Sequence, residues 1–167
     1  GMTAADTMVK TADGDIIEAE TVCPGKYIVI ITGELSAVNA SVEAAKTVHS
    51  MHLIDSFVLG NPADEIFPAI YGASKVEIVN SLGIIETYDA AAIIVAADQA
   101  AKTAEVSLIE IRLARGMCGK SYLLITGEVA AVEAAIARAQ KAVEPRGMYL
   151  DSSVIARPDK KLIDQIL

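Results

Sequence analysis

Residues 82–111, LGIIETYDAAAIIVAADQAAKTAEVSLIEI, decide the fold because three patterns follow one another within them. The apolar run at 82–87 predicts a strand. Residues 90–104 are rich in alanine, have helical spacing and contain neither proline nor glycine, which predicts an amphipathic helix. The β-branched run at 107–111 predicts a further strand. This succession indicates a small α/β domain.

The same pattern occurs earlier in the chain, so the sequence contains an internal repeat. Residues 5–12, ADTMVKTA, match residues 97–104, ADQAAKTA, at an offset of 92. Later matches keep the same order, with the offset growing to 94 at Thr-Gly-Glu (32–34 and 126–128) and to 96 at Asp-Ser (55–56 and 151–152). Ordered matches of this kind indicate a duplication, and the spacing is too long for a solenoid. We expect a first domain at 1–71, a linker at 72–81 and a second domain at 82–167.

Each copy predicts a small antiparallel sheet with helices. Copy one has expected helices at 3–12 and 36–49 and expected strands at 16–17, 27–31 and 56–59. Copy two has expected helices at 90–104 and 129–143 and expected strands at 82–87, 107–111, 122–125 and 153–156. The strand at 82–87 has no counterpart in copy one, and a sheet without it exposes an edge. We therefore expect that residues are missing at the N-terminus.

The composition excludes several classes of protein. Hydrophobic residues make up 53% of the 167 residues, which is enough to fill a core and argues against disorder. The net charge of −8 argues against a nucleic-acid partner, and no apolar run reaches the ~18 residues of a membrane span. The first residues do not have the pattern of a secretory signal. Two cysteines are too few for a disulfide scaffold, so we expect reduced thiols in the cytosol.

The sequence does not predict an enzyme. It contains no nucleophile elbow, no glycine-rich loop of the phosphate-binding type and no paired catalytic histidine and aspartate. The interpretation of the chain therefore depends on its repeat and on the loops inside the repeat.

Four motifs of copy two together resemble the shell domain of bacterial microcompartments. They are the strand at 82–87, the Ala-Asp-x-x-x-Lys helix at 97–102, Gly-Glu-Val at 127–129 and the ending Val-Ile-Ala-Arg-Pro at 154–158. The resemblance covers residues 82–158, and it is looser over 5–62, where Leu-Gly-Asn-Pro replaces the Arg-Pro ending. It implies two tandem ferredoxin-like shell domains in a structural tile of a cytoplasmic microcompartment, and a homotrimer that imitates a hexamer.

Cys23 lies in the segment TVCPGK at 21–26. By itself, a cysteine before Pro-Gly is compatible with an ordinary small residue at the end of a strand. However, the segment resembles the pore loop of iron–sulfur tandem shell proteins of propanediol-utilisation compartments. The resemblance implies one [4Fe–4S] cluster per trimer, held by Cys23 of each chain, for electron transfer across the shell. Pro24 and Gly25 keep this loop out of regular structure, and Lys26 is expected to offset the charge of the cluster.

The corresponding loop of copy two differs at the cluster position. When Lys120 is aligned with Lys26, Met117 takes the position of Cys23, and Gly119 takes that of Gly25. Cys118 is displaced by one residue, so we expect it to be structural or a free thiol.

The resemblance also implies that three basic residues, Lys10, Lys102 and Arg157, lie at the tile edge. The alternative for the two lysines is a solvated helix face, each at i, i+4 from an aspartate. Two histidines, His49 and His52, have the i, i+3 spacing of a metal pair. No third ligand beyond Asp55 is evident in the sequence, so we favour ordinary polar surface residues.

Two other functions stay open beside a cluster-bearing tile. One is a tile whose pore transports metabolites and carries no cluster, with Cys23 lining the channel. The other is a regulator that binds a small ligand, since small α/β repeats also occur in sensor domains. The expected partners are further copies of the chain, other shell proteins and a redox enzyme inside the compartment, but neither nucleic acid nor a membrane.

Overall fold

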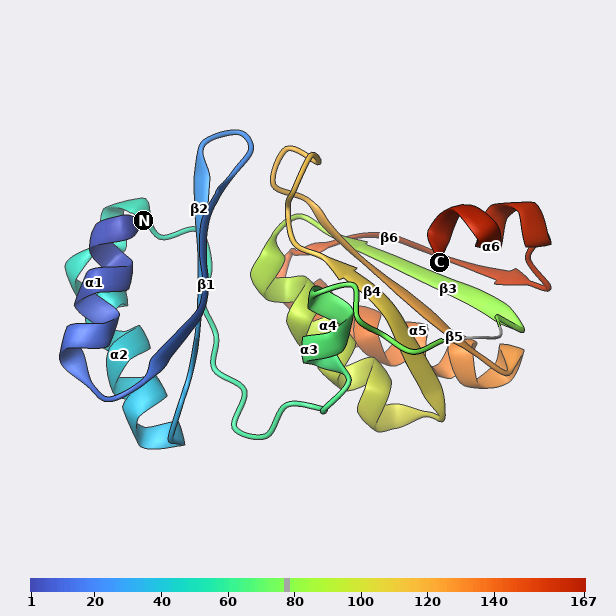
Figure 1. Cartoon of the computed structure of the whole chain (residues 1–167), viewed down its shortest axis with the longest axis horizontal. Coiled ribbons are helices and arrows are strands. Elements are labelled where there is room, and N and C mark those ends of the chain that lie inside the picture. The colour runs from blue at the N-terminus through green and yellow to red at the C-terminus, as the bar shows by residue number, and fades with distance from the viewer. Residues whose placement is uncertain (77–78) are drawn as a thin grey trace. The chain divides into compact units, whose positions relative to one another are not determined.

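The computed structural model describes residues 1–76 and 79–167, which form two compact units, Gly1–Asn61 and Pro62–Leu167 (Figure 1). Residues 77–78 of the expected linker lie outside the described residues. The first unit ends at Asn61, ten residues before the expected end of the first domain. The reason is that α3 (Ile66–Ile70) packs against β4 (Val106–Arg112) of the second unit. The boundaries of the duplicated domains stay a prediction.

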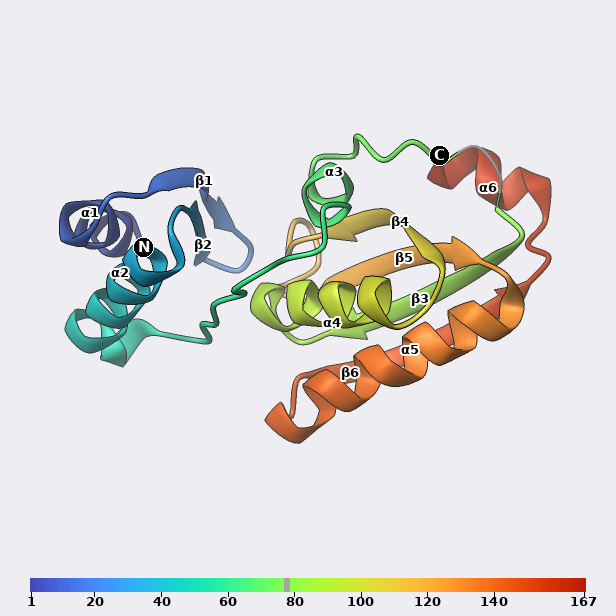
Figure 2. The ribbon, with the colours of Figure 1, turned by 90° about the horizontal axis from the view of Figure 1, so that it is seen from below.

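The second unit has a four-stranded antiparallel sheet with the strand order β4-β5-β3-β6. Its other strands are β3 (Ser81–Thr87), β5 (Ser121–Gly127) and β6 (Tyr149–Ala156). The helices α4 (Ala90–Thr103) and α5 (Val129–Val143) lie side by side against one face of this sheet (Figure 2). A short 3-10 helix, η2 (Glu144–Arg146), follows α5, and α6 (Lys160–Ile166) ends the chain. The central strand β3 therefore has a bonded neighbour on each side.

Alanine side chains let α4 and α5 pack closely on each other. Ala96, Ala97 and Ala100 of α4 and Ala135 and Ala139 of α5 are fully buried. The sheet adds three fully buried side chains to this layer, Ile85, Leu123 and Ile125. On the opposite face, Leu82, Ile109 and Leu124 form a smaller cluster, against which Val76, Val79 and Ile166 pack. The aliphatic composition noted in the sequence thus fills a thin, tightly packed core.

Gly83 lets β3 approach its neighbours closely. A Cβ atom at this position would lie 2.6 Å from Cγ1 of Val132 and 2.7 Å from Cγ1 of Ile125. Both side chains are fully buried, so neither has space to move aside. Only glycine fits this position of the central strand.

The first unit is a β-hairpin with two helices. β1 (Asp15–Val22) pairs with β2 (Lys26–Thr32) antiparallel, with an irregularity between Ile16 and Glu18. α1 (Met2–Thr11) packs against α2 (Leu35–Val48), and the 3-10 helix η1 (Ser50–His52) follows.

The strand expected at 56–59 is wrong, because this segment is not part of any strand. Its counterpart in copy two lies in β6, which bonds to β3 alone. The described part of the first unit has no strand in the place of β3. Residues 56–59 therefore have no neighbouring strand with which to pair.

The other expected helices and strands are confirmed, with shifts of a few residues at their ends. The strand expected at 16–17 is longer than predicted, since β1 spans eight residues. The fold class is confirmed as mixed α/β with small antiparallel sheets. Within residues 1–76 and 79–167, none of the helices combines the length and the apolar character that crossing a membrane requires.

Candidate functional site in the hairpin loops

Cys23 lies at the tip of the β1–β2 hairpin. β1 ends at Val22 and β2 begins at Lys26, and these two residues pair with each other, so the turn consists of residues 23–25. The N–H of Gly25 donates to the carbonyl oxygen of Val22 at 3.0 Å. Gly25 has a φ of +89°, which residues with a Cβ disfavour. The Cys23 thiol is half-buried and is not in a disulfide.

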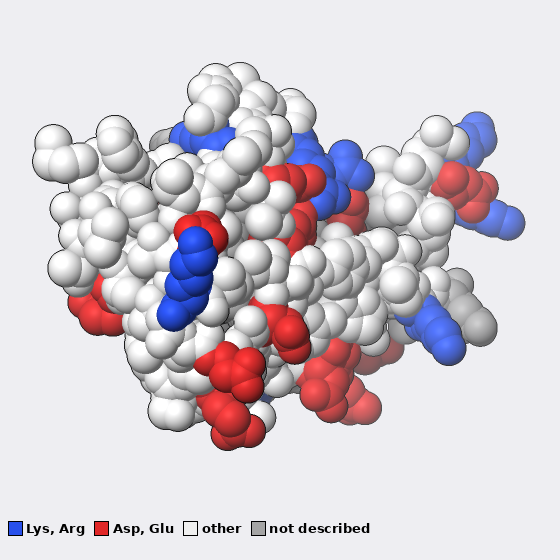
Figure 3. Space-filling model, turned by 60° about the vertical axis from the view of Figure 1, so that its left-hand side comes forward, with Lys and Arg blue, Asp and Glu red and all other residues white. Residues whose placement is uncertain are grey.

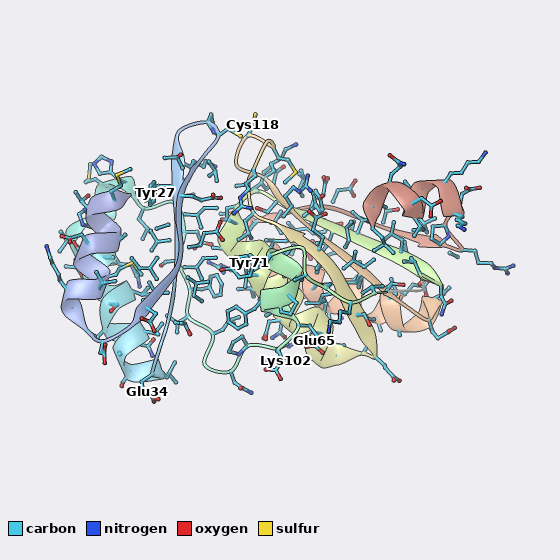
Figure 4. The ribbon with its side chains drawn as sticks, in the orientation of Figure 1. Tyr27, Glu34, Glu65, Tyr71, Lys102 and Cys118 are labelled. Carbon is cyan, nitrogen blue, oxygen red and sulfur yellow. The ribbon has the colours of Figure 1, made fainter. Side chains whose placement is uncertain are left out.

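The second loop, residues 113–120, is longer and connects β4 to β5. Gly119 has the same φ of +89° as Gly25, with which it aligns in the repeat. The N–H of Lys120 donates to the carbonyl oxygen of Met117 at 3.1 Å. Cys118 is exposed at the tip of this hairpin and has a φ of +54° (Figure 4). The two cysteines therefore differ in exposure and in backbone conformation.

A metal site within a single chain is not formed by the described residues. Among residues 1–76 and 79–167, no group of three or more His, Cys, Asp or Glu is arranged to hold a metal ion. Nε2 of His49 lies 3.1 Å from Oγ1 of Thr7, and His52 is exposed. A cluster held through Cys23 would therefore need thiols from other chains.

The two expected edge lysines have different surroundings. Nζ of Lys102, the residue labelled in Figure 4, lies 2.7 Å from Oδ1 of Asp98. The Asp98 side chain is only 3% exposed and also accepts the N–H of Ala63 at 3.0 Å. Nζ of Lys10 lies 2.7 Å from Oδ2 of Asp6, but both of these side chains are more than half exposed. The repeated motif thus holds a partly buried ion pair in copy two and a solvated one in copy one.

Arg157, the third expected edge residue, is exposed just after the end of β6. Its φ is +53°, and its N–H donates to the carbonyl oxygen of Asn80 at 3.2 Å. The backbone of this residue is therefore bonded to the segment that leads into β3, while its side chain faces solvent.

A polar cluster at the base of the second loop is absent from the sequence predictions. Arg112 donates to Oε1 of Glu110 from Nε at 2.9 Å, and its guanidinium lies 5.4 Å from the centre of the Tyr122 ring. The Tyr122 hydroxyl donates to Oε2 of Glu110 at 2.7 Å. Burial, and then the bond to Glu110, raise the pKa of Tyr122 to about 12. The spacing of Glu110 and Arg112 could have predicted their contact, because residues two apart on a strand lie on the same face of the sheet.

Basic side chains predominate in the two loops. Residues 23–26 and 113–120 contain Lys26, Arg115 and Lys120 but no aspartate or glutamate, although the whole chain carries a net charge of −8. On the face shown in Figure 3, basic side chains touch acidic ones at several places, and uncharged surface covers most of the rest. The two loops therefore carry positive charge in a chain whose net charge is negative, and this positive charge favours the binding of an anionic group.

Comparison with known proteins shows that both halves of the chain match the same protein family. The family model described as the BMC domain matches residues 1–62 and 81–158. The bacterial microcompartment shell protein PduT of Citrobacter freundii is 34% identical over 167 residues, which are 100% of this chain and 91% of that protein.

Two solved structures are similar to the chain. A microcompartment protein from Desulfitobacterium hafniense DCB has a TM-score of 0.88 and 45% identity, and the match covers 98% of this chain and 91% of that one. The fused permuted hexameric shell protein MSM0275 from the RMM microcompartment has a TM-score of 0.65 and 19% identity, and the match covers 86% and 75% of the two chains. At that identity, the second likeness shows the fold alone.

Proposed function

Because this chain belongs to the BMC-domain family and is a structural tile of a bacterial microcompartment shell, we propose that it works as a homotrimer with a [4Fe–4S] cluster on its three-fold axis. Two shell domains in each chain give a closed ring of three chains the six domains of a hexagonal tile. The tile would contact other shell proteins at its rim and contribute no enzymatic step of its own.

The observation that carries the proposal is the position of Cys23. It occupies the three-residue turn of a hairpin, and a three-fold axis near this turn would present three thiols together. Iron–sulfur clusters are held by cysteine thiolates, so the chemistry of this donor set fits the group. When bound, such a cluster supplies a one-electron carrier.

The residues around Cys23 support the same function. Gly25 keeps the turn tight through its positive φ, and Lys26 places a positive charge one residue beyond it. The corresponding loop of copy two has Met117 at the cysteine position. A trimer therefore has three thiols at this position, which suits a cluster with three protein ligands, while the three Cys118 thiols lie one residue away from it in the other loop.

The test is the iron content of the full chain after anaerobic purification and reconstitution with iron and sulfide. We expect about four irons per trimer in the parent, none in Cys23→Ser, and an unchanged content in Cys118→Ser, which is the matched control. Light scattering on the same samples should show a trimer in all three cases, because the ring would be held by contacts elsewhere.

Other outcomes of the experiment are equally decisive. A trimer that binds no iron in any variant would remove the cluster and favour a metabolite pore. A monomer at micromolar concentration would contradict the trimer itself. Loss of iron in Cys118→Ser alone would show that the cluster ligand was assigned to the wrong loop.

A further inference from the structure

A cavity of about 440 Å³ lies in the second unit, where the chain after α3 meets the end of β4. Residues 70–72 line it from one segment, and residues 110–113 and Arg115 line it from the other. Both segments belong to the unit Pro62–Leu167, so the cavity depends neither on the first unit nor on the proposed cluster. Its volume falls in the range of about 300–1,000 Å³ that is usual for small-molecule sites.

The backbone of residues 67–73 fixes one wall of this cavity. The N–H of Tyr71, which lies at the end of α3 (Figure 4), donates to the carbonyl oxygen of Phe67 at 3.2 Å. The N–H of Ala73 donates to the carbonyl oxygen of Pro68 at 2.8 Å. Since α3 also packs against β4, the two lining segments are held together before any ligand arrives.

Glu110 lines the cavity, but both oxygens of its carboxylate already accept hydrogen bonds. Oε1 accepts from Nε and Nη2 of Arg112 at 2.9 and 2.6 Å, and Oε2 accepts from the Tyr122 hydroxyl at 2.7 Å. These bonds use one side of the Arg112 guanidinium and leave Nη1 outside them. A guanidinium has five N–H donors, so Arg112 can serve a further acceptor at the same time.

Arg115 brings a second positive charge to the cavity. The bond to Glu110 raises the pKa of Arg112, while burial and the charge of Arg115 act in the opposite direction, so the two guanidinium groups are near enough to repel each other. Two arginines and one glutamate give the lining a formal charge of +1. An anion with one negative charge balances this lining, whereas Glu110 would repel a second negative charge.

From these features we propose that this cavity, which we call the acid pocket, binds a small monocarboxylic acid. The carboxylate of the ligand lies between Arg112 and Arg115, because guanidinium groups match the geometry of a carboxylate. The carbon chain of the ligand lies against Ile70, Ile111 and Leu113, which supply the apolar part of the lining. The site is independent of Cys23, so its test and the test of the cluster can fail separately.

A single tryptophan can report on the acid pocket, because the chain contains none. Tyr71→Trp places the indole at the pocket, and Tyr88→Trp is the matched control. The two tyrosines are 51% and 50% exposed, but only Tyr71 lines the pocket. Titration of hexanoate into the full chain should change the fluorescence of Tyr71→Trp in a saturable way, with a Kd in the millimolar range or tighter, and should not change that of Tyr88→Trp. Calorimetry on the parent chain should give the same Kd within about threefold.

Ligands with the same chain and another head group test the charge rule. Hexanol and hexylamine lack the carboxylate, and hexyl phosphate carries about two negative charges at pH 8. Each should bind at least about tenfold more weakly than hexanoate.

Two variants on the Tyr71→Trp chain test the role of the arginines. Arg115→Gln should weaken the binding of hexanoate about tenfold, because it removes a charge-assisted bond. The matched control is Arg138→Gln, which changes an exposed arginine of α5 outside the pocket and should leave the Kd unchanged.

Glu110→Gln separates recognition of charge from a structural role. Glutamine keeps the shape of the side chain and an oxygen acceptor for Arg112, but the formal charge of the lining rises to +2. Hexyl phosphate should then bind at least as tightly as hexanoate. A residue that only held the loop in place would not exchange the two preferences.

Several results would overturn the proposal. One is the absence of saturable hexanoate binding, and another is an equal response of Tyr71→Trp and Tyr88→Trp. Hexanol that binds as tightly as hexanoate, or an Arg115→Gln variant with the affinity of the parent, would remove the arginines from recognition. Tighter binding of hexyl phosphate than of hexanoate to the parent chain would contradict the rule of a single charge.

Discussion

Replacing Gly83 with alanine should destabilise the second unit by about 2 kcal/mol. The added Cβ would lie 2.6 Å from Val132 and 2.7 Å from Ile125, whereas ordinary contacts begin at 3.4 Å. The central strand and its neighbours must therefore move apart by about 0.7–0.8 Å. Forcing one extra methyl group into a packed core costs about 1–3 kcal/mol. Because both struck side chains are fully buried, the cost is taken at the upper end of this range, and the better strand propensity of alanine offsets about 0.5–1 kcal/mol of it, which leaves about 2 kcal/mol.

The assay is thermal unfolding followed by circular dichroism, with hydrogen exchange to assign the loss to one unit. A destabilisation of about 2 kcal/mol lowers the Tm of a domain of this size by roughly 8–16 °C. Exchange should accelerate at residues 81–87 and 121–127 but not at residues 26–32. Gly60→Ala is the control, because a Cβ there meets Leu35 at an ordinary 3.5 Å. It should change stability by less than about 0.5 kcal/mol.

A double variant tests the cause. Val132→Ala leaves a cavity on its own, but it removes the atom that the new methyl group would strike. The loss in Gly83→Ala, Val132→Ala should therefore be smaller than the sum of the two single losses by about 1 kcal/mol or more. Additive losses, or a Gly83→Ala variant as stable as the parent, would refute the reasoning from close approach.

Three further predictions concern the polar residues. Asp98→Asn should lower the free energy of unfolding in urea by about 1–3 kcal/mol, because a nearly buried carboxylate loses its ion pair, whereas the solvated counterpart Asp6→Asn should change it by less than about 0.5 kcal/mol. A raised tyrosine pKa means that the folded state holds its proton longer than the unfolded one. The contribution of Tyr122 to stability is then complete below pH 10 and is lost between pH 10 and about 12, so unfolding in urea at pH 9 and pH 11 should show a smaller loss in Tyr122→Phe than in the parent. If the proposed trimer forms, Arg157→Ala should leave it intact in light scattering but reduce the extended sheets seen by electron microscopy; sheets as abundant as those of the control Lys141→Ala would argue against an edge role.

Local patterns in the sequence were sufficient to predict most of the helices and strands. The α4 helix could be predicted because alanine spacing without proline or glycine acts within a few turns, and its N-cap Asp89 accepts the N–H of Ala92 at 2.7 Å. The equal φ of Gly25 and Gly119 agrees with the alignment of the two loops. The segment 56–59 could not be judged in the same way, because a strand exists only where another strand offers hydrogen bonds.

The residues of the candidate site also differ in whether local sequence could predict them. The turn around Cys23 could be predicted from its segment, since a turn depends on adjacent residues, but it was the family resemblance that pointed to its thiol. The bonds of Glu110 with Arg112 and Tyr122 depend on the register of β4 against β5, which local spacing does not reveal. Asp98 shows the same limit, because its partner Ala63 lies 35 residues away along the chain.

The sequence by itself determined the duplication, the order of the elements, the family and the position of Cys23 in a turn, because these follow from composition and from contacts between near neighbours. Only the tertiary structure decided which strands pair, which of two identical Asp-Lys motifs is buried, and why Gly83 must be glycine. Those properties depend on surfaces that meet across the fold. Two copies with similar sequences can therefore differ in burial, as the Asp98–Lys102 and Asp6–Lys10 pairs do.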